Sequence, residues 1–190
     1  MAYALLFALE TGIRPEEYQG LKWSDVDFEN GLVSVRRAAI WLKGKSRTFE
    51  EPKTAKSRRS IPLSNILLSA LKQHKAKQAK HILRKGEVFK RLRLVFAGVI
   101  GTPFDRNSVV RRHFKKILVK ANLPKTIRLY DLRHTCATLL PLAGKNPKVV
   151  SERLGHASVV LTLDTYSHVL PTMQKSATEK LERLLHVVNE

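Results

Sequence analysis

The spacing of apolar residues constrains the fold of this chain more than any other feature, because it is helical over most of the length. In residues 64–85, Leu67, Leu68 and Leu71 recur at helical intervals, and Gly86 then marks an end. Similar patterns predict helices at residues 2–10, a short stretch beginning at Pro15, 64–85, 107–121 (with Asn107 as its cap), 129–142, 147–154 and 171–188. The chain is therefore expected to be mainly helical.

A smaller part of the sequence has the pattern of antiparallel strands. Asn30-Gly31 is a strong signal for a hairpin turn between two strand-like segments. The basic stretch 43–59, which has few apolar residues, predicts a long hairpin or loop. The expected strands are residues 25–28, 32–40, 60–63 and 94–97. Together these patterns predict one α+β domain over residues 1–190, mainly α-helical with a small antiparallel sheet.

The charge of the chain points to a polyanionic partner. Thirty-five Lys and Arg residues face sixteen Asp and Glu residues, which gives a formal net charge of +19. Self-repulsion of this size favours a nucleic acid over a membrane surface, because the basic residues are spread along the chain, although a generic basic surface remains an alternative. No apolar run is long enough to span a bilayer. A single cysteine, Cys136, excludes an intrachain disulfide and suggests a reducing cytoplasm.

The chain contains several short motifs. Each is a weak pattern alone, but their order and spacing together are specific. They are residues 11–17 (TGIRPEE), 21–27 (LKWSDVD), 130–135 (YDLRHT), 154–156 (LGH) and 162–168 (TLDTYSH). A supporting match runs from PKT at 52–54 to RSIPL at 59–63. This combination resembles the catalytic domain of tyrosine site-specific DNA recombinases, the phage integrase family, and the resemblance covers nearly the whole chain.

The resemblance implies DNA breaking and rejoining through a 3′-phosphotyrosine, with neither a metal nor another cofactor. It assigns the nucleophile to Tyr166, the two phosphate-binding arginines to Arg14 and Arg133, a third phosphate contact to His156, the general acid to Lys53, and support of the first arginine to Glu17. Two forked guanidiniums suit the extra charge of a pentacoordinate phosphate, and they lower the cost of ionising a phenol whose ordinary pKa is about 10.

One position departs from the family. Tyr130 stands where the family most often has a histidine, three residues before the second arginine. A phenol hydrogen-bonds to phosphate but is a poor proton carrier near neutral pH, so a positioning role is expected for Tyr130. Contacts to the DNA backbone are expected from other basic residues, namely Arg58, Arg59, Arg111, Arg112, Lys125 and Arg128.

Each assignment has a plainer alternative. Arg14 and Glu17 can form an ordinary surface ion pair, His156 can be a helix-end histidine, and Cys136 is more easily a buried structural thiol than a nucleophile. The chemistry therefore depends on folding: a phenol and two guanidiniums from distant segments must surround one phosphate-sized space.

The resemblance also implies a biological setting. It suggests integration or excision of a bacterial or phage mobile element in the cytoplasm, with a separate N-terminal core-binding domain absent from this chain. The apolar stripe of the helix at 171–188 suggests docking on a neighbouring subunit, in a tetramer on DNA. Two alternatives stay open: a relaxing enzyme like type IB topoisomerases, and a DNA-binding remnant or regulator without turnover.

Overall fold

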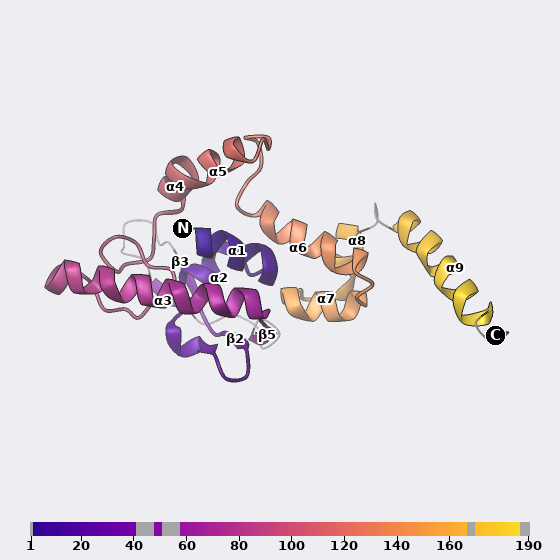
Figure 1. Ribbon diagram of the computed structural model, residues 1–190, viewed down its shortest axis with the longest axis horizontal. Helices are drawn as coiled ribbons and strands as arrows, with labels where there is room; N and C mark the ends of the chain where they lie inside the picture. The colour runs from indigo at the N-terminus through magenta and orange to yellow at the C-terminus, as the bar shows by residue number, and fades with distance from the viewer. Residues whose placement is uncertain (1, 41–47, 51–57, 167–169, 187–190) are drawn as a thin grey trace.

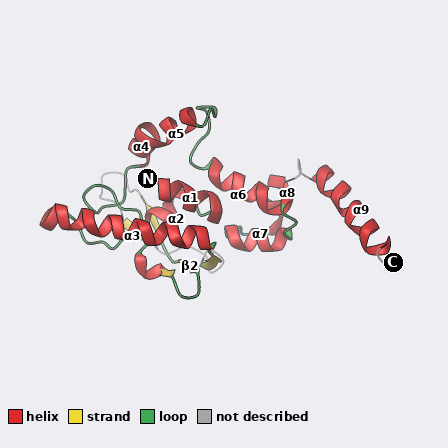
Figure 2. Ribbon diagram, in the orientation of Figure 1, coloured by secondary structure: helices red, strands yellow, loops and turns green. Residues whose placement is uncertain are grey.

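The computed structural model describes residues 2–40, 48–50, 58–166 and 170–186. Helices dominate, and short strands lie together at one side of the molecule (Figure 2). The helices are α1 (Ala2–Thr11), α2 (Pro15–Gln19), α3 (Asn65–Lys85), α4 (Arg106–Val109), α5 (Lys115–Lys120), α6 (Asp131–Leu142), α7 (Pro147–Leu154), α8 (Val159–Tyr166) and α9 (Leu170–His186). The expected mainly helical α+β fold is confirmed.

The strands form two small antiparallel sheets. The first has the order β1 (Val26–Asp27), β2 (Leu32–Val35) and β5 (Arg59–Pro62), and the second pairs β3 (Ala38–Ile40) with β4 (Thr48–Glu50). The predicted hairpin joins β1 to β2, with Gly31 at φ 64°. The Asp27 carboxylate accepts hydrogen bonds from the backbone N–H groups of Glu29 and Asn30, which fixes this turn.

Several predicted elements differ from the structure. The single strand expected at 32–40 is broken at Arg36 and Arg37, because Arg37 turns back to form an ion pair with buried Asp25. The strand expected at 94–97 is wrong: only isolated bridges form there, and the Gln78 amide donates to the carbonyls of Leu94 and Val95.

One helical prediction also needs correction, and one helix was not predicted. Asn107 is not a cap, since α4 already begins at Arg106, and a π-helical turn, η4 (Val110–Phe114), links α4 to α5. Helix α8 was not indicated by the sequence. Its apolar residues Val160, Leu161 and Leu163 are exposed, whereas the polar Thr162 is buried, so it lacks an amphipathic pattern.

Tight packing joins the N-terminal helices to the later ones. The main core includes Phe7, Tyr18 and Phe96, and a smaller cluster lies between α6 and α7. Gly12, at φ 66°, ends α1 so close to these helices that a Cβ there would lie 2.5 Å from Leu154 Cδ2 and 3.1 Å from Cys136 Sγ. The residues after α1 are therefore held directly against α6 and α7.

Cys136 belongs to this junction. It is buried, as expected for a structural thiol, and burial raises the pKa of its thiol. Within the described residues, no helix combines the length and apolar character needed to cross a bilayer. Helix α9 stands apart from the other helices, beyond α8 (Figure 1).

Candidate active site

Arg133 is a buried cation at the centre of the molecule. It lies on α6 and is 3% exposed. Its Nη1 donates to the Gly12 carbonyl at 2.7 Å and its Nη2 donates to the Leu154 carbonyl at 2.8 Å. Burial and, next, the charge of Arg14 lower the pKa of Arg133 to about 10, so the guanidinium stays protonated at neutral pH.

Arg14 approaches the same turn from another part of the chain. It precedes α2, and its Nη2 donates to the Gly155 carbonyl at 3.3 Å. Its Nη1 forms an ion pair with Glu17 at 3.1 Å, and its backbone N–H donates to the same carboxylate at 2.9 Å. Arg14 and Arg133 are 119 positions apart in the sequence, and folding brings their guanidiniums to adjacent carbonyls at the end of α7.

Glu17 orders more than one arginine. Its carboxylate is buried and accepts hydrogen bonds from Arg59 Nη1 at 3.1 Å and Arg59 Nη2 at 2.9 Å, in addition to Arg14. Burial by itself would raise the pKa of Glu17, but the hydrogen bonds and charge of Arg59, followed by those of Arg14, outweigh it and lower the pKa. Glu17 is thus an ionised partner of both arginines.

The structure places Arg59 differently from the expectation. It was predicted to contact the DNA backbone, but its side chain is 7% exposed and is turned inward toward Glu17. Strand alternation is the signal that could have indicated this, because Ile61, two residues later on β5, is fully buried. Arg58, the neighbouring residue, is exposed.

His156 completes the cluster at the end of α7. It follows Gly155, whose φ of 66° ends the helix, and its Nδ1 lies 2.8 Å from the Thr162 hydroxyl. Burial, then the charges of Arg133, Arg14 and Arg59, lower the pKa of His156 to about 4. The imidazole is therefore neutral at pH 7, with one ring nitrogen engaged by Thr162. The sequence did not single out Thr162.

Tyr166 is the last residue of α8, which packs against α6 and α7. It lies four positions after Thr162, so both Cα atoms are on the same side of the helix, about 6 Å apart along its axis. Thr162 is buried and its hydroxyl contacts His156, which ties α8 to the turn at the end of α7. Lys53 lies outside the described residues.

Tyr130 directly precedes α6. Its ring is half-buried and meets the ring of His134 edge-on, with centroids 5.0 Å apart. Its carbonyl accepts the backbone N–H of Arg133 at 3.0 Å, so Tyr130 lies one helical turn before Arg133.

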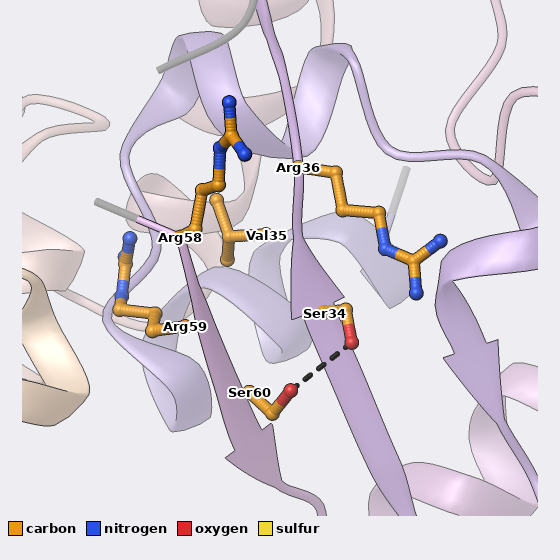
Figure 3. A pocket seen from close by; sticks show the side chains of 6 residues that line it. All are labelled: Ser34, Val35, Arg36, Arg58, Arg59 and Ser60. Atoms are coloured by element: carbon orange, nitrogen blue, oxygen red, sulfur yellow. Dashed lines mark hydrogen bonds between the residues drawn. The ribbon is translucent and has the colours of Figure 1, made fainter. Parts of the chain in front are cut away.

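The remaining basic candidates lie on the surface. Arg111, Arg112, Lys125 and Arg128 are exposed, and Arg128 forms an ion pair with Asp131 at 3.0 Å. Arg111, Lys115 and Arg128 line one open cleft of about 560 Å³. A second open pocket, of about 430 Å³, lies over β2 and β5 and is lined by Ser34, Val35, Arg36, Arg58, Arg59 and Ser60 (Figure 3).

The lowered pKa of His156 predicts how stability depends on pH. Between pH 6.5 and about 4 the unfolded chain binds more protons at this residue than the folded chain does, so stability should fall as the pH is lowered through this window and level off below it. Glu17, whose pKa is lowered from 4.5, contributes a further loss only at lower pH.

Denaturant unfolding at a series of pH values would measure this dependence. His156→Gln should make it shallower, because the amide cannot be protonated but can still hydrogen-bond to Thr162 Oγ1; His74, whose pKa burial also lowers, keeps part of the dependence. An NMR titration in which the His156 ring gains its proton near pH 6.5 would contradict the prediction.

Comparison with known proteins gives a consistent result. The profile of the phage integrase family matches residues 1–173. The chain is 36% identical over 190 residues to a XerC-like tyrosine recombinase of Caldanaerobacter subterraneus subsp. tengcongensis, with 94% of this chain and 48% of the relative covered. It is 33% identical to the ICEBs1 integrase of Bacillus subtilis, with 94% and 47% covered.

A solved structure is also similar. It is the Tn1549 transposon integrase in complex with transposon right-end DNA, with a TM-score of 0.78, 27% identity, and 95% of this chain and 58% of that chain covered. The chain spans about half the length of the curated relatives it matches.

Proposed function

The chain belongs to the phage integrase family, and on that premise we propose that it is a tyrosine recombinase catalytic domain that cleaves and rejoins DNA through Tyr166. One observation carries the proposal. Arg14, Arg133 and His156, from three distant segments, converge at the end of α7, and α8, which ends in Tyr166, packs beside them. This convergence supports the roles that the sequence motifs imply for these residues.

The arginines supply the electrostatic part of the reaction. Arg133 donates to the carbonyls of Gly12 and Leu154, and Arg14 donates to the carbonyl of Gly155, which orients both guanidiniums before any substrate binds. Their other N–H groups can donate to the non-bridging oxygens of a phosphodiester. Donors that are already oriented stabilise the additional charge of the pentacoordinate transition state without reorganisation.

His156 responds to the bound phosphate. Nearby guanidinium charges help to keep its pKa low, and a phosphate anion in the cluster offsets those charges, so the pKa rises on binding. Its second ring nitrogen is available for a phosphate oxygen or for the phenolic proton, while Thr162 holds the first.

The covalent step conserves the phosphodiester energy. The Tyr166 oxygen attacks phosphorus and gives its proton to the second ring nitrogen of His156, the bond from phosphorus to the 5′ oxygen breaks, and that oxygen leaves as a hydroxyl with a proton from Lys53. The product is a 3′-phosphotyrosine. Attack by a 5′-hydroxyl of another strand reverses these steps and rejoins DNA.

The partners of the domain follow from its surface. Arg58, Arg111, Arg112, Lys125 and Arg128 are exposed and suit phosphates of double-stranded DNA. Helix α9 stands away from the body and exposes Leu181, Leu184 and Leu185, which suit docking on a neighbouring subunit in a tetramer on DNA (Figure 1). The proposed setting is the integration or excision of a mobile element in a bacterial cytoplasm.

A nicked suicide substrate tests the function. Such a DNA loses the short strand beyond the cleavage point, so a phosphotyrosine cannot revert and accumulates as a covalent adduct. Fragments of the neighbouring genome provide candidate sites, and mass spectrometry of the digested adduct identifies the attached residue. DNA binding without an adduct on any of these fragments would instead support a regulator or remnant, and relaxation of supercoiled DNA lacking such sites would support a topoisomerase-like activity.

The salt dependence of DNA binding tests the surface contacts. Replacing Arg111 or Arg112 by Gln should weaken binding uniformly across DNA sequences and reduce the slope of log K against log salt by about 1 per lost phosphate contact. Arg84→Gln removes the same charge from the end of α3, away from α4 and α5 (Figure 1), and should leave the slope unchanged. Equal slopes for all three variants would contradict the proposed contact surface.

A further inference from the structure

Arg59 links three parts of the active site through one buried guanidinium. From β5, its Nη1 and Nη2 hold both oxygens of Glu17, at 3.1 and 2.9 Å. Its Nε donates at 2.7 Å to the carbonyl of Arg153, which lies three residues before His156. A Cβ on Gly155 would lie 2.9 Å from Arg59 Nη1 and 3.0 Å from its Cζ, so the guanidinium also packs directly against the turn.

From this geometry we propose that Arg59 is a positioning residue for DNA cleavage, which locks Glu17 and the turn at 153–156 so that Arg14 and His156 face the phosphate. The inference rests on the proposed function. Glu17 Oε1 accepts from both Arg14 and Arg59, so the direction of the Arg14 guanidinium depends on where Arg59 holds the carboxylate. The Arg153 carbonyl fixes the other end of the same link.

The charges of the cluster support this role. Arg14, Arg59 and Arg133 contribute three positive charges and Glu17 one negative charge, which leaves two net positive charges beside His156. A phosphodiester brings one negative charge, and its pentacoordinate transition state gathers more, so the surplus matches the transition state better than the bound substrate. Arg59 keeps Glu17 from neutralising Arg14 alone.

Arg59 differs in this respect from its neighbour. Arg58 is exposed, and the two side chains leave β5 in different directions (Figure 3). Arg58 therefore remains a candidate for direct contact with the DNA backbone. Arg59 acts through Glu17 and the turn, since its Nε, Nη1 and Nη2 each donate to a protein oxygen.

Single-turnover cleavage of the suicide substrate at saturating DNA tests the role. Arg59→Met should lower the rate constant about 100-fold, as expected for a small displacement of oriented groups, with DNA affinity near that of the unaltered protein. Arg59→Lys keeps the charge but cannot hold both Glu17 oxygens and the Arg153 carbonyl, so it should lose most of the rate as well. Arg36→Met removes an exposed guanidinium beside β2 and should leave the rate constant unchanged.

Two further readouts separate positioning from mere stability. Millimolar guanidinium should restore part of the rate of Arg59→Ala, and an NMR titration of DNA-free Arg59→Met should show a higher pKa for His156, whereas Arg36→Met should not. The titration does not depend on turnover. If the protein formed no adduct, the proposed function would be wrong, but the titration would still test the role of Arg59. Unchanged rate constants in Arg59→Met and Arg59→Lys, or a loss of rate with neither rescue nor a shift of the His156 pKa, would overturn the inference.

Discussion

Tyr166→Phe should abolish the covalent DNA adduct while leaving DNA affinity intact. The substitution removes one oxygen, and that oxygen is the atom that becomes bonded to phosphorus in the proposed reaction. Removing a nucleophile typically costs an enzyme about 10⁴-fold or more in rate. The proposed contacts to DNA, by contrast, come from arginines and lysines elsewhere on the chain. A denaturing gel of the trapped complex measures the adduct, and a binding titration measures the affinity.

Tyr130 provides a matched control. Tyr130→Phe removes the same atom from another tyrosine, one that lies one helical turn from Arg133 and is proposed to position groups rather than to attack. It should slow adduct formation without abolishing it. If Tyr166→Phe still formed a phosphotyrosine while Tyr130→Phe did not, the assignment of the nucleophile would have to move from α8 to the start of α6.

Helices with a strong end signal were predictable from the sequence. Helices α1 and α7 lie close to the expected ranges 2–10 and 147–154: Gly12 ends α1 and Gly155 ends α7 with a left-handed backbone, and Asn146-Pro147 opens α7. Helix α8 was missed because its apolar side chains are exposed and its buried residue, Thr162, is polar. The periodicity of apolar residues indicates which face of a helix is buried. It therefore cannot predict a helix whose buried residue is polar and contacts His156.

The site shows a similar division. The motifs indicated Arg14, Arg133 and His156, and the structure brings all three to one turn. The motifs did not indicate that Glu17 is shared, because a pairing between β5 and α2 is a tertiary contact that residue spacing does not encode. The alternation along β5 did contain part of that information, since it directs Arg59 and Ile61 to the same face.

Arg133 carries the largest expected effect among the residues proposed to bind the phosphate. Its guanidinium is buried, close to Arg14, and both burial and that neighbouring charge oppose its ionisation. Hydrogen bonds to the carbonyls of Gly12 and Leu154, which are far apart in the sequence, offset this cost and orient the guanidinium. A phosphate anion therefore stabilises this buried cation strongly when it binds, and the stabilisation increases as the transition state accumulates negative charge.

Arg133→Met should therefore lower the cleavage rate at saturating DNA by at least about 10²- to 10³-fold. Stability should fall by no more than about 3 kcal/mol, because the two carbonyls lose their donors while the burial of a charge is relieved. Arg133→Lys should lose nearly as much rate, since one ammonium cannot reach both carbonyls and also fork to the phosphate.

Lys145→Met, which removes an exposed charge just after α6, is the control and should cleave at the unaltered rate. Single-turnover kinetics and denaturant unfolding of the three variants separate the loss of catalysis from the loss of stability. If Arg133→Met cleaved as fast as the unaltered protein, the phosphate would have to bind away from the end of α7, and the convergence of Arg14 and His156 on that turn would serve the fold alone.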